Sequence, residues 1–235
     1  MNAETKFTGT KPNIEIVFED NHLLAINKPA GVLSQEDRTG RPDVLTLCKE
    51  YIKKEYNKPG NVFLGLLHRL DQPVSGIMLL AKTSKAASRV SEQIRMRTIQ
   101  KTYLAAVSGK VPQNGSLKHH LQKDKSLNKV SVVDKPTKTS KSAELTYKRL
   151  DFANNVSLIK VNLITGRAHQ IRVQFSHIGF PLLGDKKYGS AHSGLIALHA
   201  YTLKVTHPTL KNELILTSLP DKILPWSQFR LLFQG

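Results

Sequence analysis

Residues 63–82 read FLGLLHRLDQPVSGIMLLAK and place a charged segment between two apolar runs. Each run is short enough to be a buried strand, and Ser75 and Gly76 predict a tight turn with a close backbone approach that leaves room for a ligand. Because successive strand residues point to opposite faces, Arg69 and Asp71 would share one face and could project together into a cleft. The same spacing also fits a surface ion pair, which would contribute at most about 1 kcal/mol.

A second charged cluster lies in LITGRAHQIRVQ, residues 163–174. A strand is expected to run into it, and its polar residues then open a helix: Arg167, His169, Gln170 and Arg172. The helix dipole disfavours an arginine at a helix N-terminus, so a carboxylate is expected to hold Arg167, and Asp71 is the candidate partner. The alternative is a capping turn followed by a solvated basic helix.

Apolar periodicity and turn residues predict the remaining elements. Strands are expected at 14–20, 22–28, 63–71, 76–82, 101–111, 156–166 and 195–208, and helices at 42–56, 84–94 and 169–179. Pro42 should open the first helix, Ser84 should cap the second and Gly179 should close the third. The lysine-rich residues 115–142 are expected to form a hairpin or a pair of edge strands with long polar loops.

The order of these elements is irregular and contains more strands than helices, so the fold class expected is α+β with a mixed, largely antiparallel sheet. We find no internal repeat and no interdomain linker in the sequence. Residues 1–12 are polar without a period and are expected to be a loose N-terminal tail. Residues 13–235 are then expected to form one domain.

The charge of the chain indicates its partner. The sequence has 35 Lys and Arg against 18 Asp and Glu, a formal net charge of +17. A domain this basic usually meets a polyanion, and nucleic acid is favoured over an anionic membrane surface because no basic amphipathic helix with a bulky apolar face is evident. The charge is spread along the chain, which suggests a basic surface on a folded body.

The sequence also bears on the compartment. Cys48 is the single cysteine, so no intrachain disulfide can form, which fits a reducing compartment and a cytoplasmic location. Cys48 falls on the apolar face of the first expected helix, where a small buried thiol is the ordinary interpretation. No apolar run approaches the length of a membrane span, and residues 1–13 lack the apolar core of a signal peptide.

Other candidate sites are weaker. His119 and His120 with Asp124 could suggest a metal site, but adjacent histidines on a strand diverge and lysines surround them, so no metal is expected. The sequence has no G-x-S-x-G elbow, no Walker loop and no G-x-G-x-x-G. Tyr103 in KTYLAAV could be a core aromatic or a stacking platform for a base, and from the residues alone the core is favoured.

Five segments together resemble the RluA family of pseudouridine synthases. HRLDQPVSG resembles its H-R-L-D-x-x-T-S-G motif, NKPAGVLS its N-K-P-x-G segment, and KTYLAAVSG its K-x-Y-x-A-x-V-x-G segment. GRAHQIRVQFSHIGFPLLGDKKYG resembles its G-R-T-H-Q-I-R-V-H segment with the H-I-G-x-P-I-x-G-D-x-x-Y-G run that follows, and LHAYTLKVTHP its late strand. The matches occur in family order from about residue 14 to residue 220, and this order makes them far more specific than one motif.

The resemblance implies a pseudouridine synthase catalytic core with a central cleft, which converts particular uridines in tRNA or rRNA to pseudouridine. It implies roles for several residues. Asp71 matches the catalytic aspartate, Tyr103 the tyrosine that stacks on the target base, and Arg167 the arginine that pairs with the aspartate. Arg69 matches the arginine that fills the gap left by the flipped base, and Ile171 an apolar residue against that base. Further substrate contacts are expected from His68, Gln170 and Arg172.

The chemistry agrees with these residue types. The reaction breaks a C1′–N1 bond, turns the base and forms C1′–C5, without redox change or phosphate transfer, so no cofactor is expected. One carboxylate can act as nucleophile or base, an arginine beside it favours its charged form, and extruding the base costs a few kcal/mol. The residues leave open whether Asp71 attacks the sugar or the base or drives elimination, and which group removes the C5 proton.

Departures from the family pattern are small. Val74 and Ala168 stand where the family usually or often has Thr, and neither carries the chemistry. Because Asp71 and Arg167 are present, an enzyme is favoured over a non-catalytic RNA-binding protein on the same scaffold, and a metal-dependent nuclease is a distant third. The short segment before the first strand suggests a form without the N-terminal RNA-binding domain of many relatives. We expect an RNA partner and a monomer, with phosphate contacts from the basic residues 118–148.

Overall fold

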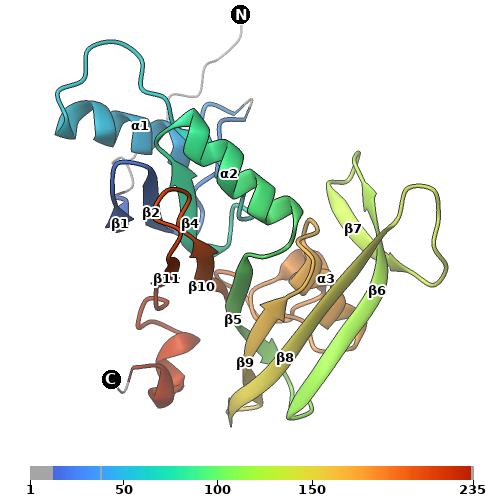
Figure 1. Cartoon of the computed structure of the whole chain (residues 1–235). Coiled ribbons are helices and arrows are strands. Elements are labelled where there is room, and N and C mark those ends of the chain that lie inside the picture. Colours follow the sequence, from blue (N-terminus) through green and yellow to red (C-terminus); the bar gives the residue numbers. More distant parts are fainter. Residues whose placement is uncertain (1–12, 38, 234–235) are drawn as a thin grey trace, which may run out of the picture.

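The computed structural model describes residues 13–37 and 39–233, so the tail expected at 1–12 lies outside the described residues. The chain forms eleven strands, three α-helices and three short 3-10 helices within these ranges (Figure 1). The strands are β1 Glu15–Glu19, β2 Leu23–Lys28, β3 Gly65–Leu66, β4 Ser75–Ala81, β5 Gln100–Ser108, β6 Asn114–Asp124, β7 Lys129–Val133, β8 Lys141–Ala153, β9 Val156–Leu163, β10 Leu198–Thr206 and β11 Glu213–Thr217. The helices are α1 Val44–Glu55, α2 Ser84–Arg95, α3 Gln170–His177, η1 Lys186–Tyr188, η2 Trp226–Gln228 and η3 Arg230–Leu232.

One sheet contains every described strand. Its order is β1-β2-β4-β10-β5-β9-β8-β6-β7, with β11 paired to β10 and β3 paired to β4. The β10–β4 pair is parallel and the other strand pairs are antiparallel. The mixed, largely antiparallel sheet of an α+β protein is therefore confirmed.

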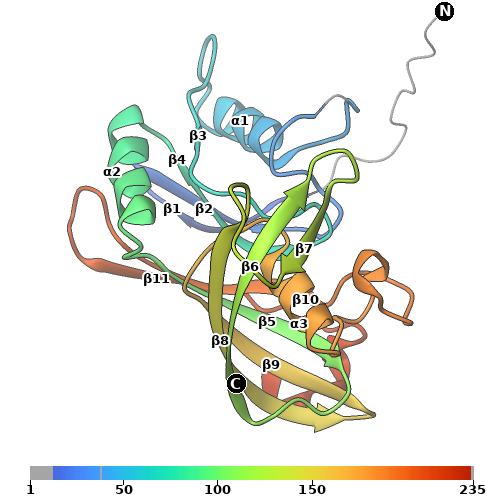
Figure 2. The same ribbon diagram turned by 90° about the vertical axis from the view of Figure 1, so that its right-hand side faces the viewer.

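In the N-terminal half of the sheet, the two-residue period of the strands sends alternate side chains to opposite helices. Leu24 and Ile26 of β2 pack with α1, whereas Leu23 and Ala25 pack in the cluster that contains Val90 of α2. The two helices therefore cover opposite faces of this part of the sheet (Figure 2).

The helix starts differ slightly from the expected ones. The N-cap of α1 is Asp43, whose side chain accepts a hydrogen bond from the backbone N–H of Thr46, so Pro42 precedes the cap. The N-cap of α2 is Thr83 and not Ser84, because its side chain accepts from the backbone N–H of Ala86. A β-region residue with a short hydroxyl or carboxylate side chain satisfies this role in both cases.

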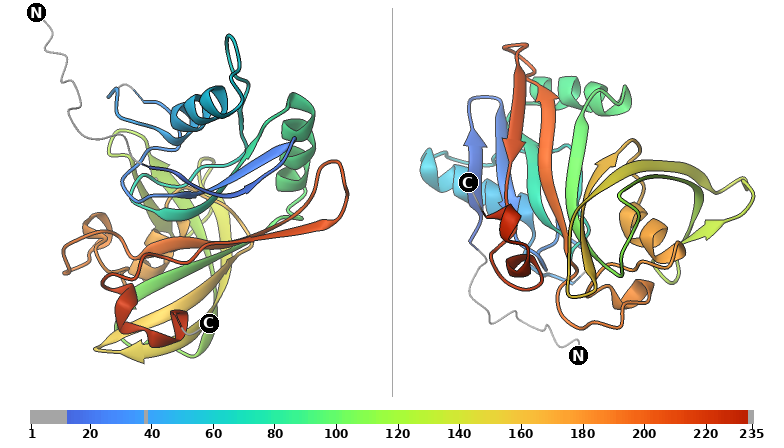
Figure 3. Two further views of the ribbon diagram at one scale, coloured as in Figure 1. Left: turned by 90° about the vertical axis from the view of Figure 1, so that its left-hand side faces the viewer. Right: turned by 90° about the horizontal axis from the view of Figure 1, so that it is seen from below.

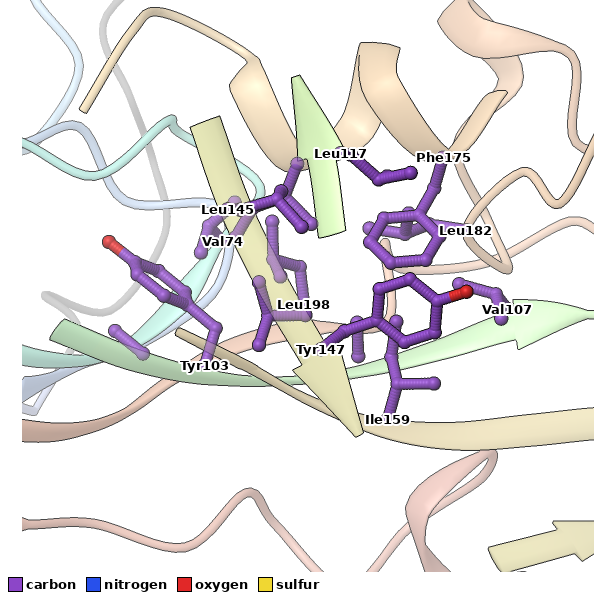
Figure 4. Packing of buried hydrophobic residues seen from close by; sticks show 14 of the residues in the cluster. Val74, Tyr103, Val107, Leu117, Leu145, Tyr147, Ile159, Phe175, Leu182 and Leu198 are labelled. Atoms are coloured by element: carbon purple, nitrogen blue, oxygen red, sulfur yellow. The ribbon is translucent and has the colours of Figure 1, made fainter. Parts of the chain in front are cut away.

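In the C-terminal half, the sheet curves around α3 (Figure 3, right). Ile171 and Phe175 of α3 pack against inward residues of β5, β8 and β9 in the largest buried cluster. Val74 and Tyr103 lie at one end of this cluster, and Phe175 lies at the other end (Figure 4). The side of the cluster at Tyr103 faces the cleft described below.

The strand expected at 63–71 is largely wrong. Only β3, Gly65–Leu66, pairs with β4, and the following residues form a turned segment that ends with the backbone N–H of Val74 donating to the carbonyl of Asp71 at 3.0 Å. Arg69 and Asp71 are therefore not held by strand alternation. A loop supplies them, as is common for functional residues on a rigid scaffold.

Gly76 has the close backbone approach that the sequence predicted, but its neighbour is a strand and not a ligand. Its φ is +113°, and a Cβ added there would lie 2.3 Å from the carbonyl oxygen of Ala200. Ala200 of β10 is the register partner of Gly76 in the parallel pair. Glycine is thus required here both by the backbone conformation and by the packing of β10.

The lysine-rich segment forms the expected hairpin, from β6 and β7. Two strands were not predicted, β8 and β11, and β8 pairs with both β6 and β9. Only β7 of this group is an edge strand, because β6 lies between β7 and β8 in the sheet. The β6–β7 hairpin lies beside α3 (Figure 2).

Candidate active site

A cleft of about 1010 Å³ opens beside the turned segment after β3. Several parts of the chain line it, among them the loop 67–74, the start of β5, the turn 163–169 with the first turn of α3, the tip of the β6–β7 hairpin, the end of α2 with the residues after it, and the segment between β2 and α1. Both charged clusters of the sequence therefore meet in one cavity. Its volume is at the upper end of the range for ligand sites.

Asp71 is partly open to this cleft, with 28% of its side chain exposed. Its Oδ2 accepts a hydrogen bond from Nη1 of Arg172 at 3.0 Å. The Nε2 atom of His169 lies 3.9 Å from the same oxygen. A carboxylate that is oriented by a buried donor and still reachable from the cleft can act on a bound molecule.

Arg172 holds two carboxylates at once. Its Nε and Nη2 atoms donate to Asp185 at 2.6 and 2.9 Å, and its side chain is only 5% exposed. Burial lowers the pKa of Arg172, but the hydrogen bonds and charge of Asp185, and then those of Asp71, outweigh this effect and raise it. The guanidinium is therefore a fixed cation between the two carboxylates.

The partner of Asp71 expected from the sequence was Arg167, and this was wrong. Arg167 lines the cleft, but its Nε donates to the backbone carbonyl of Ser142 at 2.9 Å. Its backbone N–H donates to the side-chain oxygen of Gln170 at 3.0 Å, so the residue belongs to the turn before α3. The residue that reaches Asp71 is Arg172, whose side chain projects from inside the helix.

Tyr103 and Ile171 lie where they can contact a ligand bound in the cleft. Tyr103 is a β5 residue opposite Val161 and Ala200 in the sheet, and both Tyr103 and Ile171 are largely buried while lining the cleft. Burial, and then the charge of Asp71, raise the pKa of Tyr103, so its hydroxyl keeps its proton. The core and the stacking interpretations are therefore compatible, because the ring belongs to the core cluster and also borders the cleft.

The other expected substrate contacts divide into two groups. Arg69 is exposed at the cleft, free of ion pairs within the described ranges, and available to a ligand. His68 accepts the backbone N–H of Leu79 at its Nε2, at 3.0 Å. Burial, and then the charge of Lys101, lower the pKa of His68 to about 3, so the ring is neutral.

Gln170 stabilises the turn before α3 through hydrogen bonds of its side chain. Its side-chain oxygen accepts from the Thr165 hydroxyl at 2.8 Å and from the backbone N–H of Arg167, and its Nε2 donates to the carbonyl of Glu144 at 3.1 Å. The side chain is 3% exposed. Its amide therefore serves the loop that presents Arg167.

Lys28 was not predicted as part of the site. Its side chain is fully buried, and its Nζ donates to the carbonyls of Pro29, Val32 and Gln72 at 3.0, 2.6 and 3.0 Å. Burial lowers the pKa of Lys28 to about 7, while the charge of Asp71 opposes this shift. The ammonium group therefore ties the 28–32 turn to the residue that follows Asp71.

Ser34 and Gly31 also connect the segment after β2 to the loop that carries Asp71. The Ser34 hydroxyl donates to the carbonyl of Leu70 at 2.7 Å and accepts the Leu70 N–H at 3.1 Å. The backbone N–H of Gly31 donates to the carbonyl of Gln72, and the Gln72 side chain donates back to the carbonyl of Gly31. We call these contacts of Lys28, Gly31 and Ser34 with residues 70–72 the Lys28 clamp. A lysine inside an apolar strand, followed by Pro and Gly, is the sequence signal that could have identified it.

His169 was named in the second charged cluster but given no role, and Asp185 and Tyr188 were not predicted as site residues. Nδ1 of His169 lies 2.7 Å from the Tyr188 hydroxyl, and Asp185 is 1% exposed beneath Arg172. Burial lowers the pKa of His169 although the charge of Asp71 opposes the shift. The signal in the sequence was the GDKKYG segment, which could have been read as supplying a buried acid and an aromatic.

The described residues contain no group of three or more His, Cys, Asp or Glu side chains that could hold a metal. Nδ1 of His119 instead lies 3.0 Å from the amide nitrogen of Gln174, and its ring stacks edge-on against His177 at 5.0 Å. Cys48 is buried in α1, as expected, and burial raises its pKa to about 12. In the part of the chain that the structure describes, no helix is long and apolar enough to cross a membrane.

The family model for RNA pseudouridylate synthase matches residues 22–177. Among curated proteins, the chain is 35% identical over 209 residues to the ribosomal large subunit pseudouridine synthase C of Haemophilus influenzae, covering 83% of this chain and 61% of that protein. It is 30% identical over 248 residues to the tRNA pseudouridine synthase C of Haemophilus ducreyi, covering 94% of each. The chain thus spans about three fifths of the length of the first relative.

The solved structure of human RNA pseudouridylate synthase domain containing 4 superposes with a TM-score of 0.74 at 26% identity, covering 88% of this chain and 89% of that one. The fold is therefore that of a pseudouridine synthase domain. The chain belongs to the RNA pseudouridylate synthase family, which confirms the resemblance to the RluA enzymes.

Proposed function

We propose that this protein is an RNA pseudouridine synthase that isomerises specific uridines in rRNA or tRNA. The observation that carries the proposal is a carboxylate, Asp71, oriented by Arg172 at 3.0 Å and accessible from a cleft of about 1010 Å³. The family relation supports the same reaction. Relatives named for the ribosomal large subunit and relatives named for tRNA both match over most of this chain, so rRNA and tRNA are both proposed as substrates.

In the proposed reaction the target uridine leaves its stack and enters the cleft, at a cost of a few kcal/mol. Stacking on Tyr103 and contact with Ile171 would offset part of this cost, and the exposed Arg69 would occupy the space that the base leaves. Asp71 acts as nucleophile or base. The C1′–N1 bond breaks, the uracil turns and C1′–C5 forms, while the proton on C5 is lost and N1 gains one.

Because no oxidation state changes and no phosphoryl group moves, the reaction itself calls for no cofactor. Arg172 remains paired with Asp185 throughout, so it orients Asp71 and does not serve as a phosphate ligand. Arg167 is at the rim of the cleft with its Nε bound to a backbone carbonyl, and its remaining N–H groups can donate to the RNA. This assignment gives the two arginines different roles from those expected.

We also propose that residues 13–235 act as a single domain and as a monomer in the cytoplasm. The continuous sheet supports the first point, since β10 joins strands from both halves of the chain. The lone buried cysteine and the net charge of +17 fit an RNA-binding protein in a reducing compartment. Sedimentation at several concentrations in physiological salt tests the monomer.

The test is tritium release from RNA labelled at uracil C5, offered separately as rRNA and tRNA transcripts. Wild type should release tritium from at least one of them. Asp71→Asn should release none while binding RNA with similar affinity. Asp151→Asn, a matched change on β8 away from the cleft, should remain active. Pseudouridine has the mass of uridine, so an unlabelled mass measurement is blind to the reaction.

If Asp71→Asn released tritium like wild type, the assignment of the carboxylate would be wrong. If the wild type bound RNA but released no tritium from either transcript or from ribosomal particles, a non-catalytic RNA-binding role would replace the enzyme. Loss of both folding and affinity in Asp71→Asn would also contradict the assignment, because the proposed role requires only the reaction to be lost.

A further inference from the structure

Tyr188 lies outside the cleft but contacts both groups that flank Asp71. It is the last residue of η1 and only 6% exposed. Its hydroxyl lies 2.7 Å from Nδ1 of His169, and its ring centroid lies 5.1 Å from the guanidinium carbon of Arg172. Among the described residues, His169 and Arg172 are in turn the basic groups within 4.0 Å of the Asp71 carboxylate.

The hydrogen bonds of the Tyr188 hydroxyl favour one of the two neutral tautomers of His169. The backbone N–H of Val130 donates to the hydroxyl oxygen at 3.0 Å. The hydroxyl proton is then available to Nδ1 of His169, which accepts it in the neutral ring. In this arrangement Nε2 bears the hydrogen and directs it toward Asp71, 3.9 Å away. The opposite tautomer would turn a lone pair toward the carboxylate.

Burial supports a neutral ring. Burial lowers the pKa of His169, and the positive charge of Arg172 adds to this lowering, while Asp71 opposes it. The backbone of His169 is left-handed, with φ of +52°, which is uncommon for a residue that is not glycine. Such a conformation persists only where surrounding contacts hold it, and such residues cluster at active sites. The Tyr188 hydroxyl is one of those contacts.

The ring of Tyr188 supports the second group. The Arg172 guanidinium lies over it at a cation–π distance, with Asp185 on two of its nitrogens and Asp71 on the third. Asp185 is also the residue before η1, and its carbonyl accepts the backbone N–H of Tyr188 at 3.0 Å. The short segment from Asp185 to Tyr188 therefore positions both the carboxylate and the aromatic ring that contact Arg172.

The same turn holds the lysine-rich hairpin. Tyr188 packs with Leu121 of β6 and Val130 of β7 in a small buried cluster. Next to it, Nζ of Lys187 donates to the carbonyl of Asn128 in the hairpin turn at 3.1 Å. The hairpin bears exposed lysines on both sides of its tip, including Lys125 and Lys129. A polyanion that docks on the hairpin thus docks on the element that donates to Tyr188.

We propose that Tyr188 is a positioning residue that links strand β7 of the basic hairpin to Asp71 through His169 and Arg172. This inference rests on the proposed isomerase function. In this proposal, contacts that begin at the β6–β7 hairpin and pass through Tyr188 orient the Asp71 carboxylate. RNA docking would then orient the carboxylate without any contact between Tyr188 and the substrate.

The first experiment measures kcat and KM for tritium release by Tyr188→Phe. The phenyl ring keeps its face on Arg172 and loses only the hydroxyl. We expect kcat to fall by about ten- to a hundredfold, the scale that a small misplacement of a reacting group causes, while KM stays within about twofold. Tyr147→Phe is the matched control, because Tyr147 is equally buried but packs edge-on against Phe175 away from the cleft, and it should retain wild-type kcat.

A double-mutant cycle tests whether the hydroxyl acts through His169. If it does, the Tyr188→Phe/His169→Gln double variant should be no slower than His169→Gln alone. Independent, multiplying losses would overturn the link between the two residues. Melting curves should show each variant folded. If Tyr188→Phe did not fold, His169→Gln would test the same link, since it should show the same loss in kcat at unchanged KM.

A spectroscopic measurement gives a readout other than activity. Nitrogen-15 NMR of the histidine rings, with the His169 signals assigned by their loss in His169→Gln, should show a neutral ring protonated at Nε2 in wild type. Tyr188→Phe should shift that signal toward a mixture of tautomers. A ring protonated at Nδ1 in wild type would overturn the proposal. Absence of tritium release from wild type would instead count against the proposed function, and an active wild type with a fully active Tyr188→Phe would count against this inference alone.

Discussion

The arginine that pairs with Asp71 could not be identified from the sequence, because two arginines lie close together there. Arg167 and Arg172 occur in the same segment, GRAHQIR, and only one of them reaches Asp71. Arg167 precedes α3 and bonds to the backbone of β8, whereas Arg172 faces inward from the first turn of α3. The sequence shows that an arginine is present, but the direction of the helix axis decides which one meets the carboxylate.

Lys28 gives a prediction at the residue scale. Its pKa in the folded protein is lowered to about 7 from an ordinary value of 10.5. Between these values the unfolded chain binds a proton that the folded chain lacks, so raising the pH favours the folded state. The free energy of unfolding of wild type, relative to Lys28→Met, should therefore rise with pH between about 7 and 10. Urea unfolding of both proteins across this range measures it.

Lys28→Met is a suitable reference because every other titrating group is present in both proteins and cancels in the difference. A difference that stays flat up to pH 10 would mean that the three carbonyls keep the proton on Lys28. Lys28 would then stay charged in the folded protein throughout this pH range. A rise with pH would instead mean that folded Lys28 loses its proton, and since a neutral amine has two N–H groups, it would then donate to only two of the three carbonyls.

At the scale of elements, the junction of β4 and β10 brings the site together. These strands form the parallel pair of the sheet, and β10 continues on its other side to β5, with Ala200 opposite Tyr103. The loop that carries Asp71 leads directly into β4, at Ser75. The Ser75 hydroxyl also bonds to Nδ1 of His199 at 2.8 Å, so the first residue of β4 is fixed to β10.

Gly76→Ala tests this junction. A Cβ at this position would lie 2.3 Å from the Ala200 carbonyl oxygen, and the positive φ adds strain. We expect a loss of about 1–2 kcal/mol from the backbone conformation and about 1–3 kcal/mol more from overpacking. Gly179→Ala is the matched control, with φ of +85° and open space at its Cβ, so it should show the backbone loss alone.

The measurement is the free energy of unfolding of both variants in urea. Gly76→Ala should also lose tritium release at conditions where it remains folded, because separating β4 from β10 displaces the Asp71 loop. Equal destabilisation of the two variants would indicate that β10 yields easily, and that the junction does not position the site.

At the scale of the whole molecule, charge and cleft are arranged together. The described hairpin forms one wall of the cleft, through Lys123 and Asn128, and its outer residues include several exposed lysines. Asp37 and Asp71 are the acidic residues that line the cleft; Asp37 pairs with Arg41, and Asp71 pairs with Arg172, whose charge is shared with Asp185. A phosphate backbone can therefore approach over the hairpin while a base enters beside Asp71.

RNA binding should accordingly depend steeply on salt. Each phosphate contact to a single strand contributes about 0.7 to the slope of log K against log salt concentration. Lys125→Gln/Lys129→Gln should reduce that slope by about 1.4 if both lysines contact phosphates. The control is Lys53→Gln/Lys54→Gln at the exposed end of α1, which should leave the slope unchanged. A flat salt dependence of wild type would count against a phosphate-binding hairpin.

The sequence by itself determined the α+β class, the positions of most strands and helices, the basic character and the family, because these depend on local periodicity, composition and ordered motifs. It also identified Asp71, Tyr103 and Ile171 as residues of one site. It could not show that 67–74 is a loop, because a short apolar run resembles a strand wherever it lies. Only the tertiary structure decided that Arg172 and not Arg167 meets Asp71, that Lys28 bonds to the residue after Asp71, and that Tyr188 contacts His169 and Arg172. Arg172 and Asp71 are 101 residues apart, and such contacts depend on how the sheet brings its two halves together.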